Sequence, residues 1–111
     1  MKTHLDPTAL HPLVATTPHH AQAKVRAAVD RLVDRAARGD RRAIGALAVA
    51  FHQTLHDAVV EVIDDDVDAD DVLQDFYVRL LERRWTFVAG RHDAVQWLKA
   101  NVRALARADD P

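Results

Sequence analysis

Hydrophobic residues recur every three or four positions along most of the chain from Ala21 onward, which is the period of an amphipathic helix. A first stretch of this kind runs up to Gly39, and glycine readily adopts the left-handed conformation that closes a helix. Its apolar face comprises Val25, Ala28, Val29, Leu32, Val33 and Ala36. The pattern predicts a first helix that begins at Ala21 and is ended by Gly39.

A second stripe follows Asp40, whose carboxylate is placed to accept backbone N–H bonds as the N-cap of a helix. The stripe continues for about six turns. Its members are Ile44, Leu47, Ala48, Phe51, Leu55, Ala58, Val59, Val62 and Ile63. We expect this second helix to be the longest in the protein.

A third helix is expected to begin near Asp68, because apolar residues again repeat at steps of three and four. These residues are Val72, Leu73, Phe76, Tyr77, Leu80 and Leu81. Three acidic residues, Asp68, Asp70 and Asp71, stand at its start, and Arg83 and Arg84 stand at its finish. This order of charges favours a helix, since it complements the helix dipole.

Residues 85–92 break the helical period and contain Gly90, after which Asp93 is a candidate N-cap. The apolar positions of a fourth helix are Val95, Leu98, Val102 and Leu105. Four helical stretches and no strand pattern predict an all-α protein, a small four-helix bundle.

The first 20 residues carry three prolines and no helical period. We therefore expect residues 1–20 to form a flexible or loosely docked arm and residues 21–108 to form the folded domain. The arm lacks the basic start and apolar centre of a signal peptide, and charges interrupt the longer apolar stretches. These features predict a cytoplasmic protein with no membrane partner.

Composition narrows the range of functions. The chain has 111 residues, one small domain's worth, which excludes a two-domain enzyme. It has no cysteine, which excludes disulfides, thiolate zinc sites and thiol nucleophiles. Its 15 basic and 17 acidic residues argue against a globally basic nucleic-acid binder. Charge is uneven, with seven basic residues in 24–42 and eight acidic ones in 61–75, so any DNA contact must come from a local patch.

Two motifs carry a family resemblance. Residues 68–75 read DADDVLQD, with Phe76 next and Tyr77 where the family has phenylalanine. A second, partial match follows at Val95, Gln96, Trp97, Leu98, Val102 and Arg103, with Asn101 in an apolar position. With the order of the helices, these motifs resemble region two of bacterial RNA polymerase sigma factors of the extracytoplasmic-function type. The resemblance covers residues 22–107.

The resemblance implies a protein that binds the clamp helices of the polymerase's largest subunit and helps to open promoter DNA at the minus-ten element. It implies a polymerase-binding surface on the third helix, formed by Asp71, Gln74, Asp75 and Arg79. By helical spacing these residues face outward, and an acidic, amide-bearing face suits a basic helix pair. The alternative is a solvated face whose early acids only favour the helix dipole.

The resemblance also implies DNA contacts from the segment before the fourth helix and from that helix itself. The residues implied are Phe87, Arg91, His92, Trp97, Lys99, Asn101, Arg103 and Arg107. Lys99, Arg103 and Arg107 are spaced i, i+4, i+8, which lines three cations along one side of a helix to neutralise phosphates. Phe87 offers a stacking face for an extruded base. The alternative is that Phe87 and Trp97 are core anchors.

Several departures from the family bear on DNA binding. Ala104 stands where asparagine is usual, the last residues given are acidic, and these 111 residues do not include the second DNA-binding domain of these sigma factors. We therefore expect a stand-alone region-two protein, a partner of a separately encoded second half, a former sigma domain that binds polymerase or an anti-sigma factor, or a truncated sigma factor.

Other chemistry is less well supported by the sequence. Asp64, Asp66, Asp68 and Asp75 follow a calcium-loop spacing, but Ala69 replaces the glycine that such a loop needs. His52 and His56 are one turn apart and suit a divalent ion, or else they flank the core stripe. No Ser-His-Asp arrangement and no glycine-rich phosphate loop is recognisable. We expect no enzymatic activity and no cofactor. The competing function is an interaction module that does not bind DNA, and a third is a structural or oligomeric bundle.

Overall fold

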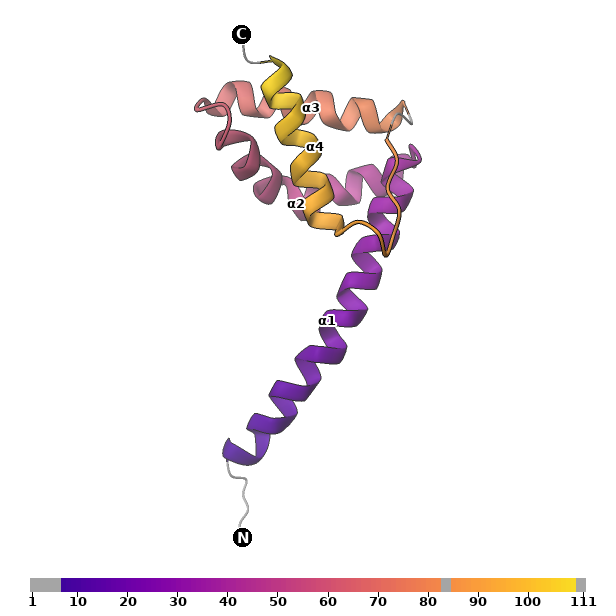
Figure 1. Ribbon diagram of the computed structural model, residues 1–111, viewed down its shortest axis with the longest axis vertical. Helices are drawn as coiled ribbons and strands as arrows, with labels where there is room; N and C mark the ends of the chain where they lie inside the picture. Colours follow the sequence, from indigo (N-terminus) through magenta and orange to yellow (C-terminus); the bar gives the residue numbers. More distant parts are fainter. Residues whose placement is uncertain (1–6, 83–84, 110–111) are drawn as a thin grey trace.

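Four helices form the structure, which is a computed structural model: α1 Pro7–Ala37, α2 Arg41–Val60, α3 Asp66–Leu81 and α4 Ala94–Asp109 (Figure 1). It describes the backbone of residues 7–82 and 85–109 and the side chains of residues 21–82 and 85–108. Within these ranges there is no strand, only an isolated bridge between Ala89 and His92. The prediction of an all-α fold with four helices is confirmed.

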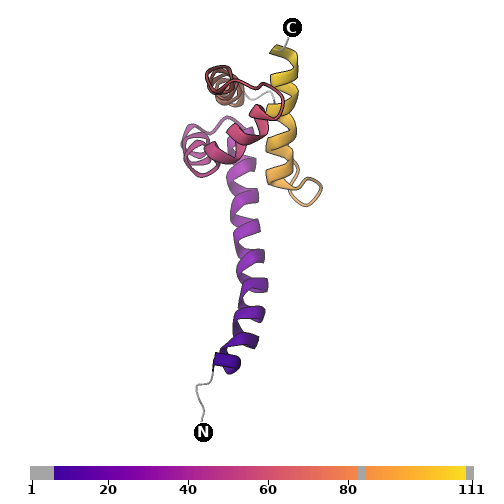
Figure 2. The ribbon, with the colours of Figure 1, turned by 90° about the vertical axis from the view of Figure 1, so that its left-hand side faces the viewer.

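α1 is longer than expected. It begins at Pro7 rather than Ala21, and its 31 residues exceed the 20 of α2, so both predictions are wrong. Its N-terminal part projects away from the other three helices (Figures 1 and 2). Proline is well suited to the first turn of a helix, where its missing N–H has no intrahelical partner. A helix that extends beyond the core needs no apolar period, which explains why the pattern did not reveal it.

The core contact of α1 starts at Val29, so the two earlier members of its expected apolar face lie outside the core. Val25 is 61% exposed and Ala28 is also exposed, whereas Val33 and Ala36 are buried. The face is therefore continuous along the helix, but only its C-terminal half is covered by the rest of the bundle.

Local capping explains where the other helices begin. The Asp40 carboxylate accepts from the N–H groups of Arg42 and Ala43 at 3.0 and 3.2 Å, as predicted. Asp93 accepts from the N–H of Gln96 at 3.0 Å, also as predicted. Gly39 and Gly90 have positive φ angles of 88° and 87°, the conformation that a side chain would strain.

The starting point of α3 differs slightly from expectation. Asp65 is the N-cap, and its carboxylate accepts from the N–H groups of Val67 and Asp68 at 2.9 and 3.1 Å. Several aspartates close together around this position offered equivalent caps to local reasoning. Arg83 and Arg84, expected to close the helix, lie outside the described residues.

The core is formed by the facing stripes of all four helices. Its largest fully buried side chains are Phe76, Leu47, Leu55, Leu73, Leu80, Leu98, Val33, Val59, Val72 and Val102. α2 ends at Val60, so Val62 and Ile63 pack on the core from the following turn rather than from the helix. α2 also has the length and mean hydropathy, 1.2, of a membrane-spanning helix. Six of its 20 residues are buried in the bundle.

Candidate interaction surfaces

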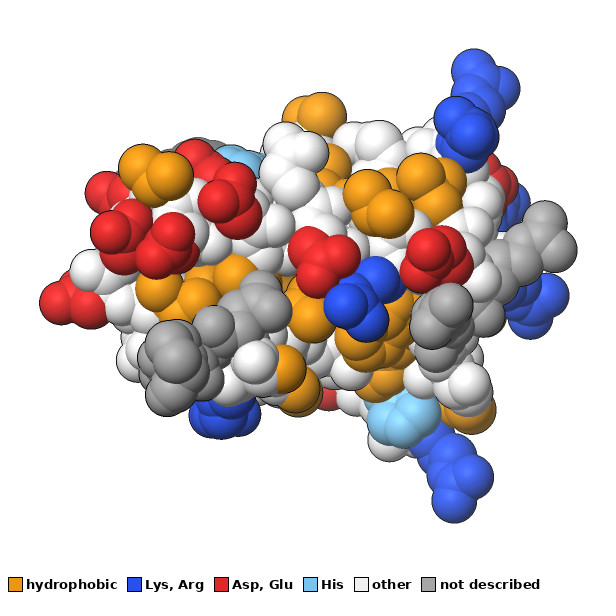
Figure 3. Space-filling model, turned by 90° about the horizontal axis from the view of Figure 1, so that it is seen from above, with side chains coloured by type: hydrophobic (Ala, Val, Ile, Leu, Met, Phe, Trp, Pro, Cys, Tyr) orange, Lys and Arg blue, Asp and Glu red, His pale blue; other side chains and the backbone are white. Residues whose placement is uncertain are grey.

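The outer face of α3 is arranged as the helical spacing predicts. Asp71 and Gln74 are exposed, and Val78 beside them is 51% exposed. The opposite face is buried at Val72, Leu73, Phe76 and Leu80. Figure 3 shows this side of the molecule, with acidic side chains gathered at one end and hydrophobic side chains further along. α3 therefore separates a core face from a mixed acidic and apolar outer face.

Asp75 and Arg79 form an ion pair along this outer face. The Arg79 Nε donates to Asp75 Oδ2 at 3.1 Å, one helical turn apart, and both side chains are partly exposed. An exposed pair of this kind contributes about 0.3–0.5 kcal/mol. The pair places the Arg79 guanidinium against the Asp75 carboxylate on the outer face, so Arg79 is not a free cation there.

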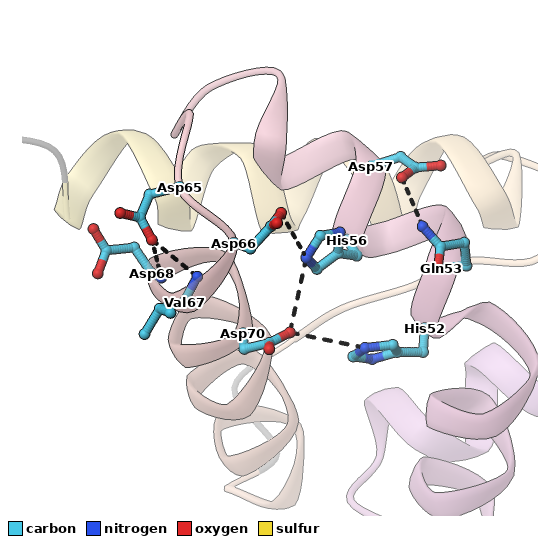
Figure 4. A network of polar contacts seen from close by, with 9 residues as sticks. All are labelled: His52, Gln53, His56, Asp57, Asp65, Asp66, Val67, Asp68 and Asp70. Atoms are coloured by element: carbon cyan, nitrogen blue, oxygen red, sulfur yellow. Dashed lines mark hydrogen bonds and ion pairs between the residues drawn. The ribbon is translucent and has the colours of Figure 1, made fainter.

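The acidic end of α3 is tied to α2 by two histidines (Figure 4). His56 Nε2 lies 3.6 Å from Asp66 Oδ1 and 3.9 Å from Asp70 Oδ1, and His52 Nε2 lies 3.9 Å from the same Asp70 oxygen. His56 is mostly buried between the helices, while His52 is half exposed. Asp66 and Asp70 thus face α2, which leaves Asp71 on the outer face.

The candidate metal ligands lie on α2 and on or just before α3. Across the described residues, no group of three or more His, Asp or Glu side chains is arranged to hold an ion. The residues with calcium-loop spacing have other roles in the structure. Asp66 and Asp68 lie within the first turn of α3, and Asp75 pairs with Arg79. His52 and His56 flank the core stripe and contact acids of α3, the second of the two alternatives that the sequence left open.

Phe87 is a core residue, so the prediction that it offers an exposed stacking face is wrong. It is only 6% exposed, and its ring meets the edge of Trp97 at a centroid distance of 5.3 Å. The segment before α4 packs against the bundle, and burial of the Phe87 ring removes a large apolar area from water.

Trp97 and Asn101 are also engaged within the protein. The Trp97 Nε1 donates to the carbonyl of Thr86 at 3.0 Å, and the Asn101 Nδ2 donates to the carbonyl of Trp97 at 2.8 Å. Trp97 also lies edge-on to Trp85 at 6.3 Å. These contacts favour the core-anchor interpretation of Trp97 over base contact.

The expected stripe of three cations on α4 is broken at its centre. The Nε and Nη2 of Arg103 donate to the Glu61 Oε2 at 2.9 and 2.6 Å, which ties α4 to the end of α2. Lys99 is half-buried and Arg107 is exposed. Because Glu61 is 42 residues away in the chain, no local spacing pointed to this pair.

Two candidate DNA-contacting residues, Arg91 and His92, lie at the tip of the loop before α4, and they differ in their contacts. His92 Nδ1 accepts from the N–H of Val88 at 2.9 Å, so its imidazole shapes the loop. Arg91 beside it is exposed. Of the eight residues implied for DNA contact, the structure leaves Arg91, Lys99 and Arg107 without a described internal partner.

Sequence reasoning missed a pair of buried polar groups behind α3. The Tyr77 hydroxyl and the Trp85 Nε1 are buried and have no hydrogen-bond partner among the described residues. Burial raises the pKa of the Tyr77 hydroxyl above its usual value of 10.0. Both rings pack on Phe76, at centroid distances of 5.9 and 5.5 Å.

Comparison with known proteins identifies no relative. No protein-family model, no curated protein and no solved structure matches the chain. The function therefore has to be inferred from the arrangement of the chain's own residues.

Proposed function

We propose that the protein is a transcription initiation domain, similar to sigma region two, that docks on the RNA polymerase clamp through the outer face of α3. The observation that carries this proposal is the coincidence of motif and geometry. Asp71, Gln74 and Asp75 come from the sigma-like motif, and they share one accessible helix face with the exposed side chain of Val78.

The chemistry of this face suits a basic pair of helices. Carboxylates at Asp71 and Asp75 would steer a cationic surface during encounter and fix its register. Val78 would supply apolar area at the centre of the contact, where interface energy concentrates.

Promoter DNA is the second part of the proposal, and it rests on fewer residues. Five of the eight residues implied for DNA contact are used inside the protein: Phe87, His92, Trp97, Asn101 and Arg103. Contacts to phosphate are left to Arg91, Lys99 and Arg107. Phosphate contacts position a protein without reading bases. This observation favours the second candidate function: an interaction module that binds polymerase, or a sigma antagonist, and does not recognise promoter sequence.

Polymerase binding is tested with the full-length protein and core polymerase in a pull-down. Reversing Asp71 and Asp75 to lysine should abolish capture while helicity by circular dichroism is retained. The matched control reverses Asp34 and Asp57, which lie on α1 and α2 and change the net charge equally. Retained capture by the Asp71→Lys, Asp75→Lys protein would contradict the assignment of this face.

The DNA part is tested on the polymerase complex with a premelted promoter template. Lys99→Ala with Arg107→Ala should lower the affinity and the slope of log affinity against log salt, by about one unit for each phosphate that is no longer neutralised. Unchanged opening and an unchanged slope would favour the interaction module without DNA contact.

A further inference from the structure

A groove lies between α1 and the segment at the start of α4. It encloses about 1040 Å³ and runs between residues 21–30 of α1 and residues 90–96. Its apolar walls include Val25 and Val29 on one side and Ala94 and Val95 on the other. Figure 1 shows the loop before α4 descending beside the C-terminal part of α1, near the point where that helix leaves the bundle.

The groove continues the core-facing stripe of α1. From Val29 toward Ala36 that stripe becomes progressively covered by the bundle, whereas Val25, one turn earlier, is 61% exposed. Core-type packing therefore stops partway along a continuous apolar face. The described part of the chain places no side chain over this end of the stripe.

The charges around the groove balance. Arg26 and Arg91 contribute two positive charges, Asp30 and Asp93 two negative ones, and His92 also lines the wall. A phosphate backbone requires an excess of cations, which these walls do not supply. An uncharged helix with one apolar face fits this lining better than a nucleic acid or a strongly acidic peptide.

The dimensions also suit a helix. A helix is about 10 Å across and rises about 1.5 Å per residue, so roughly nine residues occupy about 1000 Å³. The groove, at about 1040 Å³ and open to solvent, is of the order of size that a short helical segment requires.

We propose that the groove receives residues 7–15 of α1 from a second copy of this chain, so that two copies associate through antiparallel α1 helices. Residues 7–23 contain no Lys, Arg, Asp or Glu, which is compatible with a lining whose two positive and two negative charges sum to zero. Its sequence includes three aliphatic residues, Leu10, Leu13 and Val14, at the spacing i, i+3, i+4. The segment cannot enter its own groove while α1 is continuous, because the helix carries it away from the bundle (Figure 2).

The register of this pairing is self-consistent. If residues 7–15 of one copy oppose residues 29–21 of the other, a two-fold axis crosses the helices near residue 18, and both grooves are filled at once. Each bundle then lies beside residues 7–15 of the other copy's α1, at opposite ends of the helix pair, so the two bundles do not collide. Pro12 and Pro18 each remove a hydrogen bond from an isolated helix, and packing against a partner stabilises such a segment.

The absence of cysteine from the chain makes a direct test possible. Leu10→Cys and Val25→Cys are prepared as two separate full-length proteins and mixed under oxidising conditions. The expected product is a mixed disulfide, formed at least about tenfold faster than in the control because docking replaces bulk concentration by a millimolar effective concentration. The control mixes Leu10→Cys with Val49→Cys, since Val49 is 88% exposed on α2 and lies outside the groove.

Sedimentation of cysteine-free protein gives an independent measurement. The parent should be a dimer at micromolar concentration, Val25→Asp should be a monomer, and Val49→Asp should remain a dimer. Both valines are exposed, so neither change is expected to unfold the protein. A monomeric parent with crosslinking no faster than the control would overturn the proposal. A dimer that survives Val25→Asp would also overturn it, because the copies would then meet elsewhere.

Discussion

The outer face of α3 and the surface formed by α4 and the segment before it differ in how many of their predicted contact residues are exposed. On α3 the residues expected to face a partner, Asp71 and Gln74, are exposed above a buried stripe. At α4 the residues expected to face DNA, Phe87 and Arg103 among them, are engaged inside the protein. Helical period settles which side of one helix is polar, but it does not show which polar or aromatic group finds a partner on another element.

Phe87→Ala tests this comparison with the largest expected effect. A buried phenylalanine truncated to alanine loses about 3–5 kcal/mol of stability, and Phe87 should fall near about 3 because its loop can relax. Truncating an exposed base-stacking residue to alanine would lower stability far less. The measurement is urea unfolding, with Val88→Ala, at a neighbouring and more exposed position, as the control. A loss no greater than that of the control would return Phe87 to the DNA-binding surface.

Arg103→Ala tests the ion pair that interrupts the cation stripe. A double-mutant cycle with Glu61→Ala should give a coupling energy of about 0.5–1 kcal/mol, since the pair is partly exposed yet makes two charge-assisted hydrogen bonds. Arg107→Ala should change stability by less than about 0.5 kcal/mol. If the cycle shows no coupling, Arg103 is available for phosphate after all.

Tyr77→Phe examines the buried polar group beneath α3. Because the Tyr77 hydroxyl has no described partner, its removal should be neutral or slightly stabilising at neutral pH. The raised pKa adds a pH dependence: the unfolded chain loses this proton first, so stability is retained below about pH 10 and falls as pH rises through the folded-state pKa. Urea unfolding at about pH 8 and about pH 11 should show a smaller alkaline loss in Tyr77→Phe than in the parent. An equal loss in both proteins would assign the alkaline effect to other groups.

Asp71, on the proposed polymerase-binding face, is expected to contribute least to stability. Asp71→Ala should shift the free energy of unfolding by less than about 0.5 kcal/mol, because its side chain is exposed and off the core stripe. Its affinity for core polymerase should fall severalfold in a titration. A destabilisation of several kcal/mol would instead show that α3 depends on this carboxylate for its own stability.

Local chemistry accounts for much of the fold. The Asp40 and Asp93 caps, the turn at Gly39 and the buried stripes of α2 to α4 all follow from interactions within a few residues, which a sequence displays directly. The outward face of α3 is predictable for the same reason. A helix with one buried face leaves its other face to solvent or to a partner.

Other features depend on residues that meet only in the folded chain. The Arg103 pair with Glu61, the anchoring of Trp97 by the Thr86 carbonyl and the burial of Phe87 join segments whose spacing in the chain carries no signal of contact. The groove beside Val25 arises because the rest of the bundle covers the apolar face of α1 only from Val29 onward, an extent that apolar periodicity could not reveal. Short-range hydrogen bonding and helical period thus determine the elements. The packing of those elements decides which side chains become core, which form ion pairs and which remain available to a partner.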